Sequence, residues 1–325
     1  MRRGVRGSVV TLVLAVALGL GRMAGAADYP AREIELIVSF PAGGPADTSA
    51  RIIGPRLAAL LGQPVVVVNK PGGGGAVGAD YVAKAKPDGY TVYAATNSPL
   101  TISPHLTKSL PYKTSDFAPL GAYAVDLGVI TTRAGGPART LEEFVEYARK
   151  NPGKLSYGSA GFGTVSFFTM ELFKLAYGLD LTHVPFQGTG PVKNAMLGGH
   201  VTVATSGFGS LSPLIRSGDL VALVTTAPAR VKEFPAVPTM AEKGHSEASL
   251  NIWMGLYVPV KTPRPVQDAL ARALATAARD PAVAGALEKA GMHADYKDAA
   301  ETQRLLDAES STVGKVVERL GLQKQ

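Results

Sequence analysis

Two glycine-rich segments hold the residues of this sequence that are best suited to chemistry. In the first, Phe40–Asp47, two adjacent glycines lie between an apolar stretch and a helix-forming stretch. In the second, Tyr157–Ser166, serine and threonine hydroxyls alternate with glycines. A helix that begins directly after such a turn has backbone N–H groups without partners, and these bind anions without any basic side chain. Each segment therefore predicts half of a site for a small anion.

The two segments are expected to act together, because neither provides enough binding energy alone. A helix N-terminus stabilises an anion by ~0.3–1 kcal/mol, and by up to ~2 kcal/mol when partly buried. A micromolar ligand requires about −8 kcal/mol. Several charge-assisted hydrogen bonds of about 1.5–3 kcal/mol each must therefore converge on one carboxylate. Two loops that face each other across a cleft provide them. The alternative for each loop is an ordinary turn between a strand and a helix.

A third glycine-rich stretch, PGGGGAVG, imitates a dinucleotide-binding motif. Gly73, Gly75 and Gly78 have the G-x-G-x-x-G spacing and follow a run of four valines. We reject this interpretation because the tripeptide NKP separates the valines from the glycines, and because no acidic residue ends a following strand. The stretch is instead expected to be a loop that lines the cleft, and no cofactor is predicted.

The histidines and the absence of cysteine argue against catalysis. The five histidines are widely spaced and show no metal-ligand pattern. The chain has no G-x-S-x-G motif, and without cysteine it has neither a thiol nucleophile nor a Cys-ligated metal. A Ser/His/Asp set stays open, because its members meet only in space. We expect a binding protein and not an enzyme; a periplasmic hydrolase with such a set is the remote alternative.

Short β-branched runs alternate with helical stretches along most of the chain, which predicts an α/β fold with mostly parallel sheets flanked by helices. After residue 259 the chain becomes helical, with one further short strand near 293–296. The expected strands are 34–39, 65–69, 91–96, 128–132, 155–158, 201–205 and 220–225. The expected helices are 47–61, 76–84, 141–151, 166–177, 191–197, 211–217, 265–279, 281–290 and 299–320.

The first residues have the pattern of an export signal. Arginines at 2, 3 and 6 precede the apolar stretch Val9–Leu20, and alanines at 24 and 26 fit a cleavage site after Ala26. The apolar stretch is short for a membrane span, which needs roughly 20 residues. The sequence therefore predicts a signal peptide over 1–26 and a periplasmic protein; a retained anchor is the alternative.

Length and charge limit what the mature protein can be. Its roughly 300 residues suffice for two domains. The net charge of the whole chain is +7, and removing the four arginines of the signal segment leaves +3. The remaining basic residues are scattered, so the charge is not that of a nucleic-acid-binding protein. We also expect Trp253, the only tryptophan, to pack at a domain junction.

An ordered set of short motifs relates the sequence to a known family. These motifs include FPAGGPADTSAR, NKPGGGGAVGADYVAKAKPDGYT, NPGKLSYGSAGFGT, LTHVPFQGTGP and WMGLYVPVKTP. With them the chain resembles the Bug/TctC family, the periplasmic solute-binding proteins of tripartite tricarboxylate transporters. The resemblance covers nearly the whole mature chain.

The resemblance implies a two-domain periplasmic binding protein of the type II-like kind, with a ligand cleft and a hinge between the domains. On this sequence it implies one domain from 28–127 and 253–325 and a second from 128–252. It implies a monomer that captures a small organic carboxylate for the membrane subunits of a transporter. A sensor that presents the bound carboxylate to a signalling receptor needs the same cleft and is the alternative.

The family's cleft residues can be placed on this sequence by matching the motifs. The implied ligand-binding residues are Phe40, Ala42, Gly43, Gly44, Asp47, Thr96, Asn97, Ser159, Gly163, Thr164, Gln187, Thr189 and Ser206. Two departures matter. Many relatives have Asp at the position of Ser206 and His at that of Phe167. We therefore expect the site to hold a carboxylate with a less polar remainder, aromatic or aliphatic.

Overall fold

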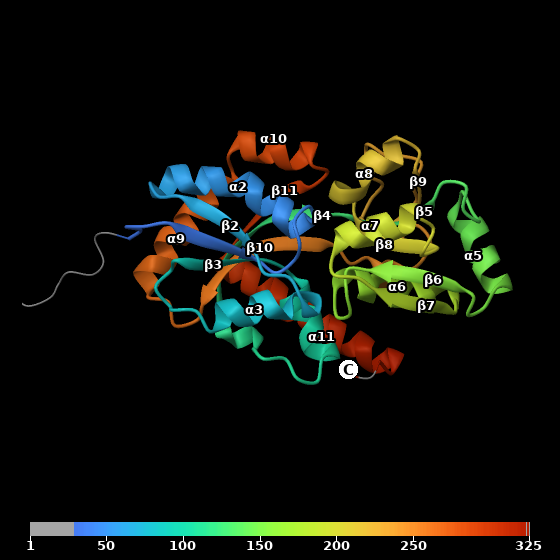
Figure 1. The fold of residues 1–325 in the computed structure, drawn as a ribbon, viewed down its shortest axis with the longest axis horizontal. Coiled ribbons are helices and arrows are strands. Elements are labelled where there is room, and N and C mark those ends of the chain that lie inside the picture. The colour runs from blue at the N-terminus through green and yellow to red at the C-terminus, as the bar shows by residue number, and fades with distance from the viewer. Residues whose placement is uncertain (1–28, 323, 325) are drawn as a thin grey trace, which may run out of the picture.

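The computed structural model describes residues 29–322 and 324, so the predicted signal peptide lies outside the described residues. Two β-sheets lie side by side, each covered by helices (Figure 1). The chain builds the first sheet, leaves it after Asp126 to build the whole second sheet, and returns to the first at Ile252.

The first sheet has six strands in the order β11-β4-β10-β3-β1-β2. β1 pairs in parallel with both β2 and β3, whereas β10 is antiparallel to β3 and β4, and β11 is antiparallel to β4. The strands are β1 (Ile34–Val38), β2 (Val65–Asn69), β3 (Thr91–Thr96), β4 (Phe117–Asp126), β10 (Ile252–Pro259) and β11 (His293–Asp298).

The second sheet has five strands in the order β7-β6-β8-β5-β9. β6 is parallel to β7 and β8, and β5 is antiparallel to β8 and β9. The strands are β5 (Gly128–Arg133), β6 (Leu155–Ser159), β7 (Leu181–Pro185), β8 (Val203–Gly207) and β9 (Leu220–Thr225).

The α/β class and the two-sheet architecture are as expected, but the sheets are mixed and not mostly parallel. The parallel pairs come from strand–helix–strand units such as β1-α2-β2, in which the helix returns the chain to the same end of the sheet. β4 ends at Asp126 in the first sheet and β5 begins at Gly128 in the second. Both strands are antiparallel to all of their neighbours. β4, β7 and β10 were not among the expected strands, because they contain Ala, Gly or Pro, which form strands poorly unless neighbours pair with them.

Strand side chains alternate between two buried faces. In β1, Leu36 and Val38 pack into one core and Ile37 into another; in β5, Val129 and Ile130 divide in the same way. Helices therefore cover both faces of each sheet. The helices are α2 (Pro45–Leu61), α3 (Ala76–Ala83), α4 (Ser103–Leu106), α5 (Leu141–Lys150), α6 (Val165–Tyr177), α7 (Thr189–Leu197), α8 (Phe208–Arg216), α9 (Arg264–Ala278), α10 (Pro281–Lys289) and α11 (Ala299–Leu320).

The last helix, α11, connects the two halves. Leu306 packs into a core beneath the first sheet, whereas Val313 and Val317 pack into the core of the second sheet, together with Ile102 and Leu106. The helix accordingly runs beneath both halves (Figure 1). None of the described helices is long and apolar enough to span a membrane.

Candidate functional site

The first glycine-rich loop leads from β1 into α2. Gly43 has a positive φ of 83°, which turns the chain, and Gly44 is the N-cap with Pro45 at the first helical position. Asp47 is buried and accepts a hydrogen bond from the N–H of Gly43 at 3.0 Å. Burial alone would raise the pKa of Asp47, but hydrogen bonds from Arg51, Gly43 and Asn69 lower it overall. Asp47 thus stabilises the loop internally.

The second glycine-rich loop leads from β6 into α6 and is held by its own hydroxyls. Thr164 is the N-cap: its hydroxyl oxygen accepts from the N–H of Phe167 at 3.3 Å, and the hydroxyl donates to the carbonyl of Gly161 at 2.6 Å. The hydroxyl oxygen of Ser166 accepts from the N–H of Ala160 at 2.9 Å. These hydrogen bonds within the loop stabilise its conformation.

Three further polar residues come from neighbouring strand and helix ends. Thr96 is the last residue of β3, Thr189 is the first residue of α7, and Ser206 lies near the end of β8. The hydroxyls of Thr189 and Ser206 lie 3.2 Å apart. The hydroxyl of Thr96 is buried and makes no hydrogen bond among the described residues.

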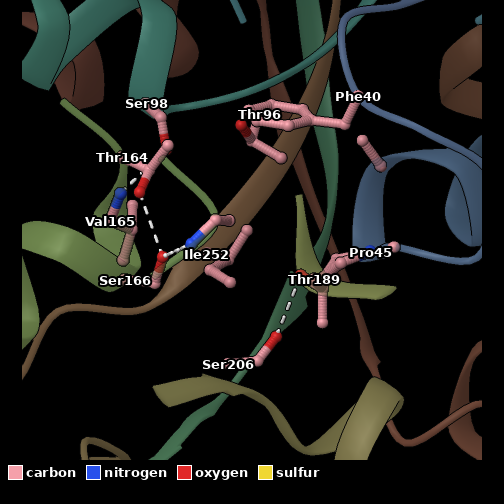
Figure 2. A pocket seen from close by; sticks show the side chains of 13 residues that line it. Phe40, Pro45, Thr96, Ser98, Thr164, Val165, Ser166, Thr189, Ser206 and Ile252 are labelled. Atoms are coloured by element: carbon pink, nitrogen blue, oxygen red, sulfur yellow. Dashed lines mark hydrogen bonds between the residues drawn. The ribbon is translucent and has the colours of Figure 1, made fainter. Parts of the chain in front are cut away.

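These segments surround a small cavity between the two sheets (Figure 2). Its volume is about 40 Å³, which is room for a few water molecules and far below the ~300–1,000 Å³ of most ligand pockets. The lining residues are Phe40, Gly44, Pro45, Ala46, Thr96, Ser98, Ala160, Thr164, Val165, Ser166, Thr189, Ser206 and Ile252.

Six of the residues expected at the ligand lie at this cavity, and the others of that set do not. The six are Phe40, Gly44, Thr96, Thr164, Thr189 and Ser206. Ala42, Gly43 and Gln187 are exposed outside it. The side chain of Asn97 turns away and donates to Glu309 at 2.8 Å. The carboxylate of Asp47 accepts from the N–H of Gly43 within its own loop. The carbonyl of Gly163 accepts from the hydroxyl of Ser103 at 3.1 Å.

Sequence reasoning missed several lining residues. Ser98 and Val165 each directly follow a residue or loop that was expected to line the site, so their place in the sequence was a usable signal. Ile252 lies 156 positions beyond Thr96, in the returning strand β10, and only the antiparallel pairing of β10 with β3 brings it close. No local sequence pattern predicts such a contact.

The cavity combines hydroxyls with apolar side chains, and none of the residues that line it in the described chain is ionisable. The first turns of α2, α6 and α7 all reach it, which brings three helix N-termini together at the cavity. Three helix N-termini favour negative charge at this point. The arrangement can hold a small anion without a cationic side chain.

Comparison with known proteins identifies the family. The family model TctC, described as "Tripartite tricarboxylate transporter family receptor", matches residues 49–322. The chain belongs to the TctC family. The periplasmic binding protein BugD has a similar structure, with 31% identity and a TM-score of 0.87 over 91% of this chain and 100% of that one.

Two other structures similar to this TctC-family chain were solved with carboxylates. MatC from Rhodopseudomonas palustris, with bound malate, is 31% identical with a TM-score of 0.85 over 89% of this chain and 100% of that one. An R. palustris protein with adipate is 28% identical with a TM-score of 0.87 over 92% and 100%. The TctC family consists of periplasmic solute-binding proteins, and the chain is not an enzyme.

One serine–histidine pair in this TctC-family chain resembles part of a hydrolytic triad. The hydroxyl of Ser159 lies 2.7 Å from Nε2 of His183, and burial lowers the pKa of His183 to about 4. Ser159 is fully buried and is absent from the cavity lining. The ring of His183 stacks on Tyr157 and packs against the tilted ring of Phe167. The pair therefore belongs to the packing of the second half, and Phe167 does not line the cavity.

Proposed function

We propose that this protein captures a small organic carboxylate in the cavity between its two sheets and delivers it to the membrane subunits of a tripartite tricarboxylate-type transporter. The observation that carries the proposal is the meeting of three helix N-termini and a set of hydroxyls at a cavity without a charged side chain. Malate and adipate in similar structures support a carboxylate ligand. We propose that the protein acts as a monomer in the periplasm after loss of residues 1–26.

The small size of the cavity supports a mechanism in which the two halves close around the ligand. The cavity is too small for an extended ligand to enter as it stands, so the sheets must separate and close again. We propose that 28–127 with 253–325 and 128–252 are the two domains that move. A ligand drives closure only if it binds the closed form more tightly than the open one.

We further propose that the ligand's remainder is less polar than an amino acid. Ser206 presents a hydroxyl where a charged group would be needed to bind an ammonium, and Phe40, Val165 and Ile252 give the cavity an apolar side. The carboxylate lies between Gly44 and Thr164, and Thr96, Thr189 and Ser206 contact the rest of the ligand.

Thermal-shift measurements with malate, adipate, hexanoate, benzoate, glutamate and citrate test this function. We expect at least one of the first four to raise the melting temperature in a concentration-dependent way. Stabilisation by glutamate or citrate alone would refute the less polar remainder. If none of the six stabilises the protein, carboxylate capture at this site is wrong.

A substitution at Gly44 tests whether the ligand binds in this cavity. Gly44 has φ −89°, which valine adopts, and an added Cβ would lie 3.9 Å from the hydroxyl of Thr189. Gly44→Val should therefore fold normally and lose ligand stabilisation, because its side chain fills the cavity. Gly285→Val is the control, since an added Cβ there meets no atom within 4 Å. Equal ligand shifts in both variants would place the ligand elsewhere.

A further inference from the structure

A carboxylate on α11 joins chain segments from both ends of the sequence. Glu309 is half-buried, and its carboxylate accepts three hydrogen bonds: from Asn97 Nδ2 at 2.8 Å, from the hydroxyl of Thr101 at 2.5 Å, and from Trp253 Nε1 at 2.8 Å. Asn97 follows β3, Thr101 lies in the short helical segment Ser98–Ile102, and Trp253 lies in β10. No basic side chain is among these partners.

The partners of Glu309 are direct chain neighbours of the cavity residues. Asn97 lies between Thr96 and Ser98, and both of these line the cavity. Trp253 follows Ile252, which also lines it. Glu309 itself does not reach the cavity. Glu309 therefore hydrogen-bonds to residues of these two segments that point away from the cavity, whereas their neighbours line it.

Other hydrogen bonds join the same two segments to each other. The N–H of Asn97 donates to the carbonyl of Trp253 at 3.1 Å, and Asn97 Nδ2 also donates to the carbonyl of Asn251 at 3.1 Å. Glu309 adds a side-chain bond to each segment from a third element, α11. α11 packs against the cores of both halves. The position of the two segments therefore depends on the position of α11 relative to these cores.

We propose that Glu309 is a positioning residue for ligand binding: it fixes Asn97 and Trp253 and thereby keeps Thr96, Ser98 and Ile252 turned to the cavity. The inference rests on the proposed function of that cavity. Without the carboxylate, Asn97 Nδ2 keeps only the carbonyl of Asn251 as acceptor and Trp253 Nε1 loses its acceptor, so both segments lose their side-chain bonds to α11. The lining then loses its arrangement while the helices and sheets stay folded.

Trp253 gives a direct measurement, because it is the only tryptophan and its indole N–H donates to Glu309. Glu309→Gln keeps the side-chain length but presents an NH₂ group to at least one donor. We expect the tryptophan emission of the ligand-free mature protein to shift. The affinity for whichever of malate, adipate, hexanoate or benzoate stabilises the wild type should fall by about tenfold or more.

Glu171→Gln is the matched control. Glu171 is a partly buried glutamate of α6 that accepts from the hydroxyl of Tyr157 at 2.5 Å and pairs with Lys174 at 2.9 Å, and it makes no hydrogen bond to Trp253 or Asn97. We expect this variant to lower the melting temperature and to leave both the emission and the affinity unchanged. A similar loss of affinity in the control would show that general destabilisation accounts for the effect.

The two readouts separate this inference from the proposed function. Unchanged emission in Glu309→Gln overturns the inference, whether or not a ligand is found. Shifted emission with unchanged affinity overturns it as well, because the segments would then move without consequence for binding. If no carboxylate binds the wild type, the proposed function fails, while the emission still decides whether Glu309 fixes the Trp253 segment.

Discussion

The hydroxyl of Ser98 accepts a hydrogen bond from the backbone N–H of Val165 at 3.0 Å. Ser98 lies two residues beyond the end of the first sheet's β3, and Val165 is the first residue of α6, which covers the second sheet. An N–H group in the first turn of a helix has no partner within that helix. Here a side chain from the other half of the molecule provides one, so the described conformation has its two halves in contact at the cavity.

Replacing Ser98 should weaken this contact. Ser98→Ala leaves the buried N–H of Val165 without its acceptor, which costs about 1–3 kcal/mol. We expect a lower melting temperature and a weaker response to a stabilising carboxylate. Ser217→Ala, at an exposed site, should change neither. If Ser98→Ala behaves like Ser217→Ala in both respects, the hydrogen bond does not contribute to the contact.

Gly74 should limit how closely the halves approach. A Cβ at Gly74 would lie 2.4 Å from the carbonyl oxygen of Phe162, in the loop of the second half. Gly74→Ala should therefore increase the radius of gyration in small-angle scattering and lower ligand affinity. Gly135 has a similar φ of 72°, and an added Cβ there meets no atom within 4 Å. Gly135→Ala thus shares the roughly 1–2 kcal/mol of backbone strain but not the clash. Equal radii for the two variants would contradict the prediction.

Asp126 should make stability depend on pH. It is fully buried at the end of β4, one oxygen accepts from the N–H of Gly209 at 3.0 Å, and the other has no hydrogen bond among the described residues. Burial raises the pKa of Asp126 to about 7. The folded protein therefore keeps this proton at pH values where the unfolded chain, with a pKa near 3.8, has released it.

The contribution of Asp126 to stability is consequently lost as the pH rises from about 4 through 7. Asp126→Asn does not titrate, so its free energy of unfolding relative to wild type should rise by on the order of 2 kcal/mol between pH 5 and pH 8. Urea unfolding of both proteins at the two pH values measures this difference. A difference that stays constant with pH would show that Asp126 is ionised throughout.

Thr96 should contribute to binding without contributing to folding. Thr96 lines the cavity, and its buried hydroxyl has no partner among the described residues. Thr96→Val should leave the ligand-free melting temperature unchanged or slightly raised, and should weaken carboxylate binding by roughly 2- to 15-fold, the equivalent of one hydrogen bond. Thr131→Val, where the hydroxyl donates within the second sheet, should lower stability and leave affinity intact. The opposite pattern would remove Thr96 from the site.

The sequence by itself determined most of the helices, eight of the eleven strands and the loops that begin the helices at the site. Period-2 and helical hydrophobic patterns and the glycine turns are local, so α2, α6 and α11 begin within two residues of their expected starts. The family motifs extended this to the two-domain fold. Of the thirteen residues predicted to bind the ligand, six line the cavity, namely Phe40, Gly44, Thr96, Thr164, Thr189 and Ser206, and the other seven do not.

Only the tertiary structure decided which residues of each segment face the cavity. Asn97 and Ser98 are adjacent, yet one turns to Glu309 and the other to Val165, because pairing with β10 and packing on α11 fix the rotation of the chain there. The antiparallel pairs of β10 in the first sheet likewise join a strand that follows the whole second sheet in the sequence to strands that precede it. These contacts join residues up to 212 positions apart, and no local pattern carries that information.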